Sequence, residues 1–296
     1  MSSKQNKFRI KIKKWLLNHP KINPFNNYFK MYSSSVRLLP TVMIVGFHKT
    51  ATTSLHEYLI QHPNVIKPIR KEIGYFSVFF WRGEMWYKSH FPTIFSKLIK
   101  NKKNENFVVL DSDPNCSYHP HSPNRIYQRL PDIKLIFILR NPIDRAWSDF
   151  NQDLNRNWIS KISFEEKIKD DKADLDKMMN SLKYQKIQSD YFKEIPRAYL
   201  SIGKYVNYIK KWFEYFPPEQ ILFLTTDELK SDLDTSFTKI FNFLNIPNQP
   251  IPNLEKRNIG KYKKMNLETR KKLIEYYRPF NLELETLLNK KFNWDK

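Results

Sequence analysis

The fold is decided in the stretch Thr41-Val-Met-Ile-Val-Gly-Phe-His-Lys-Thr-Ala-Thr-Thr-Ser-Leu-His56, where an apolar run passes directly into a polar loop and then into a helical pattern. Residues 42–45 predict a buried parallel strand, Gly46 a turn of the chain, and residues 52–62 a helix. A helix that starts directly after a strand points unpaired backbone N–H groups at the connecting loop, where they can bind an anion. The side chains that can close around a phosphate there are those of Lys49, Thr50, Thr52, Thr53 and Ser54. An ordinary strand–helix connection with a solvated lysine explains this stretch as well when it is taken alone.

Apolar runs alternate with helical patterns through the rest of the chain. Further strands are predicted at 107–110, 134–139 and 221–224, and further helices at 123–130, 142–158, 204–216, 229–245 and 267–289. Strands buried on both faces, with helices between them, predict an α/β fold: a three-layer sandwich with a central parallel sheet and a P-loop-like phosphate-binding strand–loop–helix. Ligands of such sheets bind beyond the carboxyl ends of the strands.

The composition favours a single globular domain with a core. The chain has 296 residues, of which 41% are hydrophobic and 15% aromatic. A lone cysteine, Cys116, and the absence of a His, Cys, Asp or Glu cluster with ligand spacing predict neither a disulfide nor a metal site. No apolar run approaches the roughly 20 residues of a membrane span, so we expect a soluble, cytoplasmic protein.

The net charge of +21 points to anionic partners. No acidic residue precedes Glu57, so residues 1–40 are expected to form a basic N-terminal arm and residues 41–296 the domain. The arm can form a short amphipathic helix that rests on an anionic membrane or on the domain itself. No nucleic-acid recognition motif accompanies the charge, so specific nucleic-acid binding is not expected. The pattern does not predict an oligomeric state.

A second candidate site follows the strand predicted at 134–139. Arg140 ends that strand, Pro142 suits a helix start, and Ser148 lies two helical turns after the arginine. The guanidinium fork and the hydroxyl can converge on one phosphate. A salt bridge from Arg140 to a nearby carboxylate is the alternative for this segment alone.

The phosphate loop followed about ninety residues later by strand-Arg-Asn-Pro and a serine closely resembles the sulfotransferases that use 3′-phosphoadenosine 5′-phosphosulfate (PAPS). Several segments are similar to the heparan-sulfate-type and bacterial members. These segments are Arg70-Lys-Glu-Ile-Gly-Tyr-Phe76, Met85-Trp-Tyr-Lys-Ser-His-Phe-Pro92, Thr226-Asp-Glu-Leu229, Phe241-Asn-Phe-Leu-Asn-Ile-Pro247, Asn258-Ile-Gly-Lys-Tyr262, Tyr277-Arg-Pro-Phe-Asn281 and Phe292-Asn-Trp-Asp295. The resemblance covers roughly residues 41 to 295. The loop Gly46-Phe-His-Lys-Thr50 lacks the length and second glycine of a nucleoside-triphosphate loop, so a P-loop kinase or NTPase fits less well.

The resemblance implies a donor site and a reaction. The first loop would hold the 5′-phosphosulfate, Arg140 and Ser148 the 3′-phosphate, and a later basic loop would close over the 3′-phosphate and adenine. That later loop contains Arg257, Gly260, Lys261 and Tyr262. PAPS would donate a sulfuryl group to a hydroxyl or amine, leaving adenosine 3′,5′-bisphosphate (PAP). A carbohydrate acceptor is favoured; a small-molecule alcohol or amine is the alternative, and a non-catalytic basic protein that binds nucleotide or nucleic acid is the alternative of another class.

The resemblance also suggests catalytic residues. Lys49 would neutralise charge on the leaving oxygen, and Glu72 would be the base, with a pKa raised by apolar neighbours. Small-molecule sulfotransferases use a histidine instead, and His119, His121 and His90 are the alternatives.

Three departures from the family pattern stand out. Ala51 replaces the glycine of the usual Lys-Thr-Gly-Thr-Thr loop, so the backbone there is expected to avoid positive φ. Gly74 stands where a histidine is frequent, which removes a second acid–base group beside Glu72. Residues 111–115, Asp-Ser-Asp-Pro-Asn, replace a segment that carries a substrate-side lysine in some members.

Overall fold

Five parallel strands form one sheet in the order β2-β3-β1-β4-β5. The computed structural model describes residues 30–95, 106–184, 198–251 and 262–295, and the structural statements below concern these residues. The strands are β1 (Val42–Ile44), β2 (Val65–Ile66), β3 (Val108–Ser112), β4 (Lys134–Leu139) and β5 (Ile221–Thr225). Central β1 pairs with β3 on one side and β4 on the other, so that Val42 lies opposite both Leu110 and Lys134.

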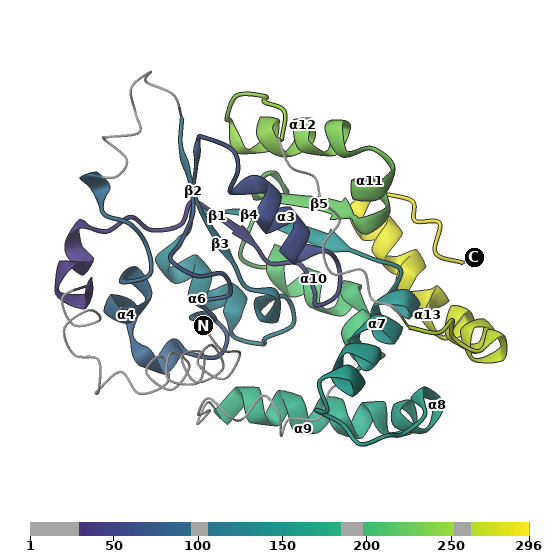
Figure 1. Cartoon of the computed structure of the whole chain (residues 1–296). Helices are drawn as coiled ribbons and strands as arrows, with labels where there is room; N and C mark the ends of the chain where they lie inside the picture. The colour runs from purple at the N-terminus through teal and green to yellow at the C-terminus, as the bar shows by residue number, and fades with distance from the viewer. Residues whose placement is uncertain (1–29, 96–105, 185–197, 252–261, 296) are drawn as a thin grey trace, which may run out of the picture.

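Helices cover both faces of the sheet, as Figure 1 shows. Alternate residues of β1 point to opposite faces: Val42 and Ile44 join one hydrophobic cluster, and Met43 joins the other. The first cluster packs α3 (Thr52–Leu59), α11 (Thr226–Ser231) and α12 (Leu233–Leu244); the second packs α4 (Glu84–Lys88), α6 (Ser122–Arg129) and α10 (Tyr205–Phe213). The predicted three-layer α/β sandwich with a parallel sheet is confirmed.

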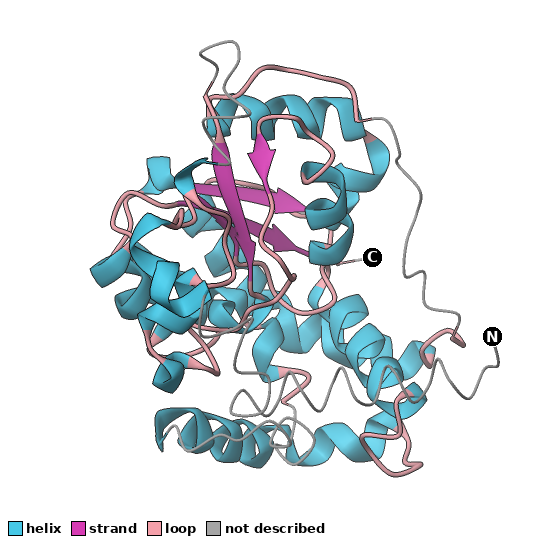
Figure 2. Cartoon of the chain, turned by 60° about the vertical axis from the view of Figure 1, so that its left-hand side comes forward, coloured by secondary structure: helices cyan, strands magenta, loops and turns pink. Residues whose placement is uncertain are grey.

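A third hydrophobic cluster lies outside the sandwich and joins α7 (Pro142–Asn155) to α13 (Leu267–Leu288). The charged segment after α7 forms α8 (Phe164–Lys167) and α9 (Asp171–Tyr184), and Figures 1 and 2 show it at one end of the molecule, away from the strands. Short 3₁₀ helices span Ser33–Val36, Phe80–Arg82, Pro114–Ser117, Ile168–Asp170, Ser201–Gly203 and Pro218–Gln220.

The sequence predictions miss some element boundaries. The short edge strand β2 was not predicted, and β3 continues two residues beyond the predicted 107–110 because its polar ends, Asp111 and Ser112, are buried and hydrogen-bonded. The helix predicted at 229–245 is two helices, since the Asp232 side chain accepts a hydrogen bond from the backbone N–H of Thr235 and starts α12.

Gly46 is needed for a reason other than the predicted turn. It is not among the residues with positive φ. A Cβ at this position would lie 2.8 Å from the backbone nitrogen of Ile138 in β4. The glycine therefore allows the loop to leave β1 in close contact with the neighbouring strand.

The described end of the arm packs on the domain. Arg37 forms an isolated antiparallel bridge with Thr93 and donates a hydrogen bond to the carbonyl of Phe91. Residues 1–29 lie outside the described residues, and the predicted boundary between arm and domain at residue 40 stays a prediction. In the described part of the chain, every helix is too short or too polar to cross a membrane.

Candidate active site

The loop between β1 and α3 has an unusual backbone. Lys49 and Ala51 both have φ of 68°, in the left-handed region, whereas Thr50 between them does not. The expectation that Ala51 avoids positive φ was wrong: alanine adopts the conformation that glycine would take more easily. Where left-handed and right-handed backbone conformations alternate, successive N–H groups point into one concavity, which suits an anion. Strain kept at such a place is typical of functional sites.

The N-terminus of α3 completes this concavity. No side chain caps the helix, because Ala51 occupies the N-cap position. The first N–H groups of α3 are therefore open to an anion, which the helix dipole also favours. The Thr50 hydroxyl is buried and donates to the carbonyl oxygen of Phe47 at 2.7 Å, so it braces the loop from inside. Thr52 is also buried, and Ser54 is partly exposed.

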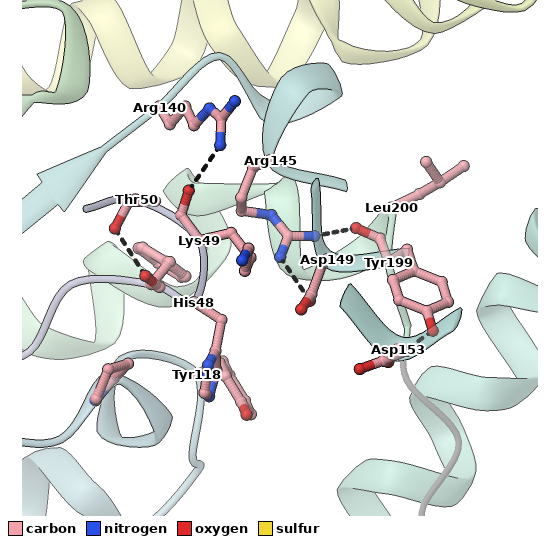
Figure 3. A network of polar contacts seen from close by, with 12 residues as sticks. His48, Lys49, Thr50, Tyr118, Arg140, Arg145, Asp149, Asp153, Tyr199 and Leu200 are labelled. Atoms are coloured by element: carbon pink, nitrogen blue, oxygen red, sulfur yellow. Dashed lines mark hydrogen bonds and ion pairs between the residues drawn. The ribbon is translucent and has the colours of Figure 1, made fainter. Parts of the chain in front are cut away.

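Arg140 reaches the same loop from the end of β4. Its Nη1 donates to the carbonyl oxygen of Lys49 at 3.1 Å, as Figure 3 shows. Tyr205 donates to the Arg140 carbonyl at 2.9 Å, and Thr226 donates to the carbonyl of Leu139 at 3.1 Å. The two candidate sites predicted from the sequence, which follow β1 and β4, thus lie at the same edge of the sheet.

Lys49 lies in a cluster of cations. Its pKa is lowered, first by burial, and the positive charges of Arg140 and Arg156 act in the same direction. Asp149 and Asp153 on α7 oppose the shift. Gathered like charges are unfavourable on their own. The cluster is therefore a place where a polyanion would be stabilised. Arg156 was not among the site residues predicted from the sequence.

Helix α7 carries the second predicted site. The Asn141 side chain accepts a hydrogen bond from the N–H of Ile143 and begins the helix, and Pro142 occupies its first turn. Ser148 is 5% exposed on this helix. Trp147 directly precedes Ser148 in the chain, and its ring centroid lies 6.4 Å from that of Tyr262. The other members of the predicted late loop, Arg257, Gly260 and Lys261, lie outside the described residues.

A buried ion pair supports α7 below the loop. Arg145 is fully buried, and its Nη1 lies 3.2 Å from Oδ2 of Asp149 one turn later. It also donates to the carbonyl oxygen of Tyr199, whose hydroxyl donates to Asp153 at 2.7 Å. Figure 3 shows Lys49 beside this pair. The carboxylates that offset the positive charge of Lys49 are therefore themselves held in place.

Glu72 lies close to the phosphate loop through Lys71. The ammonium of Lys71 is 2.7 Å from Oε1 of Glu72 and donates to the hydroxyl oxygen of Thr53 on α3 at 2.8 Å. The expected rise in the pKa of Glu72 was wrong. Burial raises it, but the charge and hydrogen bond of Lys71, with smaller contributions from His48 and His56, outweigh burial, and the pKa is lowered. The Glu72 side chain is 46% exposed, so solvent moderates these effects.

Two buried carboxylates lie at the end of β3, Asp111 within the strand and Asp113 directly after it, and both are beyond the strand that the sequence predicted. Asp111 accepts a hydrogen bond from the Tyr87 hydroxyl at 2.7 Å, and burial raises its pKa to about 6. Asp113 accepts from Ser77 at 2.5 Å, and burial raises its pKa as well. Ser77 and Tyr87 both follow Glu72 in the chain. The carboxylates thus tie the Glu72 segment to the sheet, a role that only the tertiary structure reveals.

Of the three histidines considered as alternative bases, His90 is hydrogen-bonded, His119 is buried and His121 is exposed. His90 contacts the carbonyl oxygen of Trp86 through Nδ1 at 2.8 Å, and burial lowers its pKa to about 4. His119 is 2% exposed, accepts from the N–H of His121 at 3.2 Å, and has its pKa lowered to about 3 by burial. His121 is exposed at the start of α6.

Two other histidines do lie at the site. His56 on α3 contacts the Ser112 hydroxyl at 2.7 Å, and burial lowers its pKa to about 4. His48 directly precedes Lys49, and its Nε2 lies 2.8 Å from Oδ1 of Asn115. The sequence could have indicated His48 as a site residue, because it lies in the phosphate loop beside Lys49. Within the described ranges, no group of three or more His, Cys, Asp or Glu side chains is arranged to hold a metal ion.

Comparison with known proteins points to a family. The model of the sulfotransferase domain family matches residues 39–281. The chain is 31% identical over 224 residues to a bifunctional heparan sulfate N-deacetylase/N-sulfotransferase 1 of Caenorhabditis briggsae, covering 74% of this chain and 24% of the relative. It is 25% identical over 297 residues to the human heparan sulfate glucosamine 3-O-sulfotransferase 3B1, covering 92% of this chain and 69% of that protein.

Another relative is the membrane-associated sulfotransferase kil1 of Dictyostelium discoideum, 24% identical over 320 residues, which cover 86% of this chain and 66% of that protein. The chain therefore spans about a quarter of the nematode relative and about two thirds of kil1. Among solved structures, a sulfotransferase from Alicyclobacillus acidocaldarius superposes with a TM-score of 0.65 at 21% identity, over 88% of this chain and all of that one. The last match concerns the fold.

Proposed function

Since the chain belongs to the sulfotransferase domain family, we propose that it transfers the sulfuryl group of PAPS to a hydroxyl or amine of a carbohydrate and releases PAP. The observation that carries the proposal is the convergence of Lys49, Arg140 and the open N-terminus of α3 at one edge of the sheet. An ordinary strand–helix connection gives no reason for three such features to meet.

The donor would lie along this edge. The loop from Lys49 to Ser54 would hold the 5′-phosphosulfate through its N–H groups, and Arg140 and Ser148 would bind the 3′-phosphate. The placement of Tyr262 beside Trp147 supports a late loop that closes near Ser148. Arg257, Gly260 and Lys261 are proposed for that loop from the sequence resemblance.

The reaction asks the protein to align two oxygens and to stabilise charge. As the bond from sulfur to the acceptor oxygen forms, the bond from sulfur to the 5′-phosphate oxygen breaks. The Lys49 ammonium would stabilise the charge that develops on the leaving oxygen, an effect worth on the order of 3 kcal/mol for one such donor. We propose that the Glu72 carboxylate assists the removal of the acceptor's proton.

Heparan sulfate chains are the first acceptors to test. Two of the relatives named above, the nematode and the human protein, act on heparan sulfate by their names, and the net charge of +21 favours the approach of an acidic glycan. A small-molecule alcohol or amine is the second candidate, since nothing in the described site requires a polymer.

Location and membrane contact are separate proposals. We infer a cytoplasmic location from the sequence, and a weak contact of the basic arm with anionic membranes from its charge. Fractionation of cells that express the full chain would test the first proposal, and sedimentation with phosphatidylserine vesicles would test the second.

The proposed function is tested by binding and turnover. PAP is expected to raise the melting temperature, whereas ATP and oligonucleotides are not, and labelled PAPS is expected to transfer sulfate to desulfated heparan chains. Lys49→Ala and Arg140→Ala should each lower transfer by at least 10²–10³-fold, because each removes a charge that faces the donor. Lys211→Ala, on the exposed side of α10, is the matched control and should retain activity.

Glu72→Gln should retain PAP binding and lose turnover. Stabilisation by ATP or DNA but not by PAP would refute the proposal, as would an undiminished rate in Lys49→Ala.

A further inference from the structure

His48 is the one titratable side chain of the phosphate loop itself apart from Lys49, and its orientation is set by a chain of hydrogen bonds. Oδ1 of Asp113 accepts from the backbone N–H of Asn115 at 3.1 Å and from the Asn115 side-chain Nδ2 at 3.2 Å. Oδ1 of Asn115 in turn lies 2.8 Å from Nε2 of His48. The hydroxyl of Tyr118 also donates to this oxygen, at 2.9 Å.

These hydrogen bonds determine which nitrogen of His48 carries the proton. Because Oδ1 of Asp113 is an acceptor for a backbone N–H, the Asn115 group that faces it is the NH₂. The carbonyl oxygen of Asn115 therefore faces His48, and Nε2 must donate to it. In the neutral imidazole, Nδ1 then holds the lone pair. Among the described residues, no hydrogen bond occupies Nδ1, and the residue is partly exposed.

The orienting group is itself firmly held. Asp113 is 1% exposed and also accepts hydrogen bonds from the Ser77 hydroxyl at 2.5 Å and the Cys116 thiol at 3.1 Å. Its backbone N–H donates to the carbonyl of Ile44, the last residue of β1, at 3.1 Å. A buried carboxylate, an amide and an imidazole in series resemble the arrangement in which a third group orients a catalytic base.

Glu72 lies near enough to His48 for the two charges to interact, since His48 contributes to the lowered pKa of Glu72. Lys71 already donates a hydrogen bond to that carboxylate, which weakens Glu72 as a proton acceptor. Three segments thus supply the charged and polar groups around His48. The loop after β2 supplies Glu72, and the phosphate loop itself supplies Lys49. The segment after β3 supplies Tyr118 and Asp113, which acts by way of Asn115.

We propose that His48 is a further catalytic residue, whose Nδ1 takes the proton of the acceptor, and that Asn115 is its positioning residue. The step is balanced: the acceptor oxygen or nitrogen bonds to sulfur, the bond from sulfur to the 5′-phosphate oxygen breaks, and the acceptor's proton moves to Nδ1. The Glu72 carboxylate stabilises the imidazolium that forms. This inference rests on the proposed function and supplies, from a different position, the acid–base group that Gly74 lacks.

The test compares two substitutions of His48 in the full chain, with labelled PAPS and desulfated heparan chains. His48→Gln keeps a side-chain N–H for Asn115 but no proton acceptor, and kcat/KM should fall by about 10²–10⁴-fold with PAP binding unchanged. The ascending limb of the pH–rate profile should disappear in His48→Gln and persist in the residual activity of Glu72→Gln. His48→Ala leaves room for a free imidazole, so added imidazole should restore part of its activity but none of that of His48→Gln.

Asn115→Ala tests the positioning role. It should lower kcat, change the pH profile and gain nothing from imidazole, whereas Asn124→Ala on α6 is the matched control and should behave as the wild type.

The outcomes separate the two proposals. If the wild-type chain neither binds PAP nor transfers sulfate, the proposed function fails. If the wild type is active and His48→Gln keeps its rate and pH profile, or loses PAP binding instead of turnover, the role of His48 is overturned while the sulfotransferase function stands.

Discussion

At the scale of single residues, Ala51 stands where the usual family pattern has glycine, yet it takes the left-handed conformation that glycine adopts easily. A left-handed conformation costs an alanine about 1–2 kcal/mol relative to a right-handed one, and glycine avoids most of that cost. The surrounding contacts hold it there: Thr50 braces the loop from inside, and Arg140 bonds the carbonyl of Lys49. The proposed anion site is thus formed by backbone that the fold strains.

Substitutions of Ala51 should separate strain from bulk. Ala51→Gly should keep PAP binding and not lower the free energy of unfolding, because relief of the left-handed strain offsets the greater freedom of the unfolded chain. Ala51→Val should destabilise the protein by more than 2 kcal/mol and weaken PAP binding, since a β-branched residue tolerates this φ poorly. Denaturant unfolding measures the stability of each variant, and PAP titration measures its affinity for PAP. Equal stability of the glycine and valine variants would show that the loop changes conformation.

Asp111 should give stability a measurable pH dependence. Its pKa is raised from 3.8 to about 6 by burial, so between these pH values the folded state binds more protons than the unfolded state. The contribution is fully present below about pH 4 and is lost as the pH rises through 6, a change on the order of 3 kcal/mol. Relative to Asp111→Asn, the wild type should therefore lose stability from pH 4 to 7 in urea unfolding. Exposed Asp132→Asn should show no such difference, and parallel curves for wild type and Asp111→Asn would contradict the assignment.

At the scale of elements, α7 combines three tasks. Its N-terminus is capped by Asn141, whose Nδ2 donates to the carbonyl of Trp294 and so ties the C-terminal tail to the site. Its middle carries Ser148, and its buried face carries Arg145 and Asp149. Because both partners of this ion pair are out of water, the loss of one leaves an uncompensated charge.

Removal of Asp149 should therefore be costly. Asp149→Ala is expected to lower the free energy of unfolding by about 3–5 kcal/mol. Asp144→Ala breaks the exposed contact with Arg270 on α13, where the two side chains are 42% and 27% exposed, and should cost less than about 1 kcal/mol. Thermal and urea unfolding compare the two. If Asp149→Ala does not fold, Asp149→Asn supplies the comparison, and a loss no larger than that of Asp144→Ala would contradict the structural role.

At the scale of the whole molecule, the site depends on segments far apart in the chain that meet at one edge of the sheet. β1, β3, β4 and β5 all end there, and the loops after the first three supply Lys49, Asn115 and Arg140. Thr226, directly after β5, bonds the backbone at the end of β4. Two hydrophobic clusters, one on each face, hold these strand ends in place. The rigidity of the site therefore comes from the sandwich as a whole.

The sequence by itself determined the fold class, most helices and strands, and the strand–loop–helix that carries Lys49, because these follow from local patterns: apolar runs of strand length, helical periodicity and a polar loop between them. It also named Lys49, Arg140 and Ser148 as candidate donor-binding residues, because they stand at predicted strand ends or on the helix that follows. Only the tertiary structure decided the rest. The left-handed Ala51 depends on contacts around the loop, the lowered pKa of Glu72 on Lys71, and the orientation of His48 on Asn115, 67 residues away. Backbone strain, charge interactions and hydrogen bonds between distant residues exist only once the chain is folded, so no local pattern encodes them.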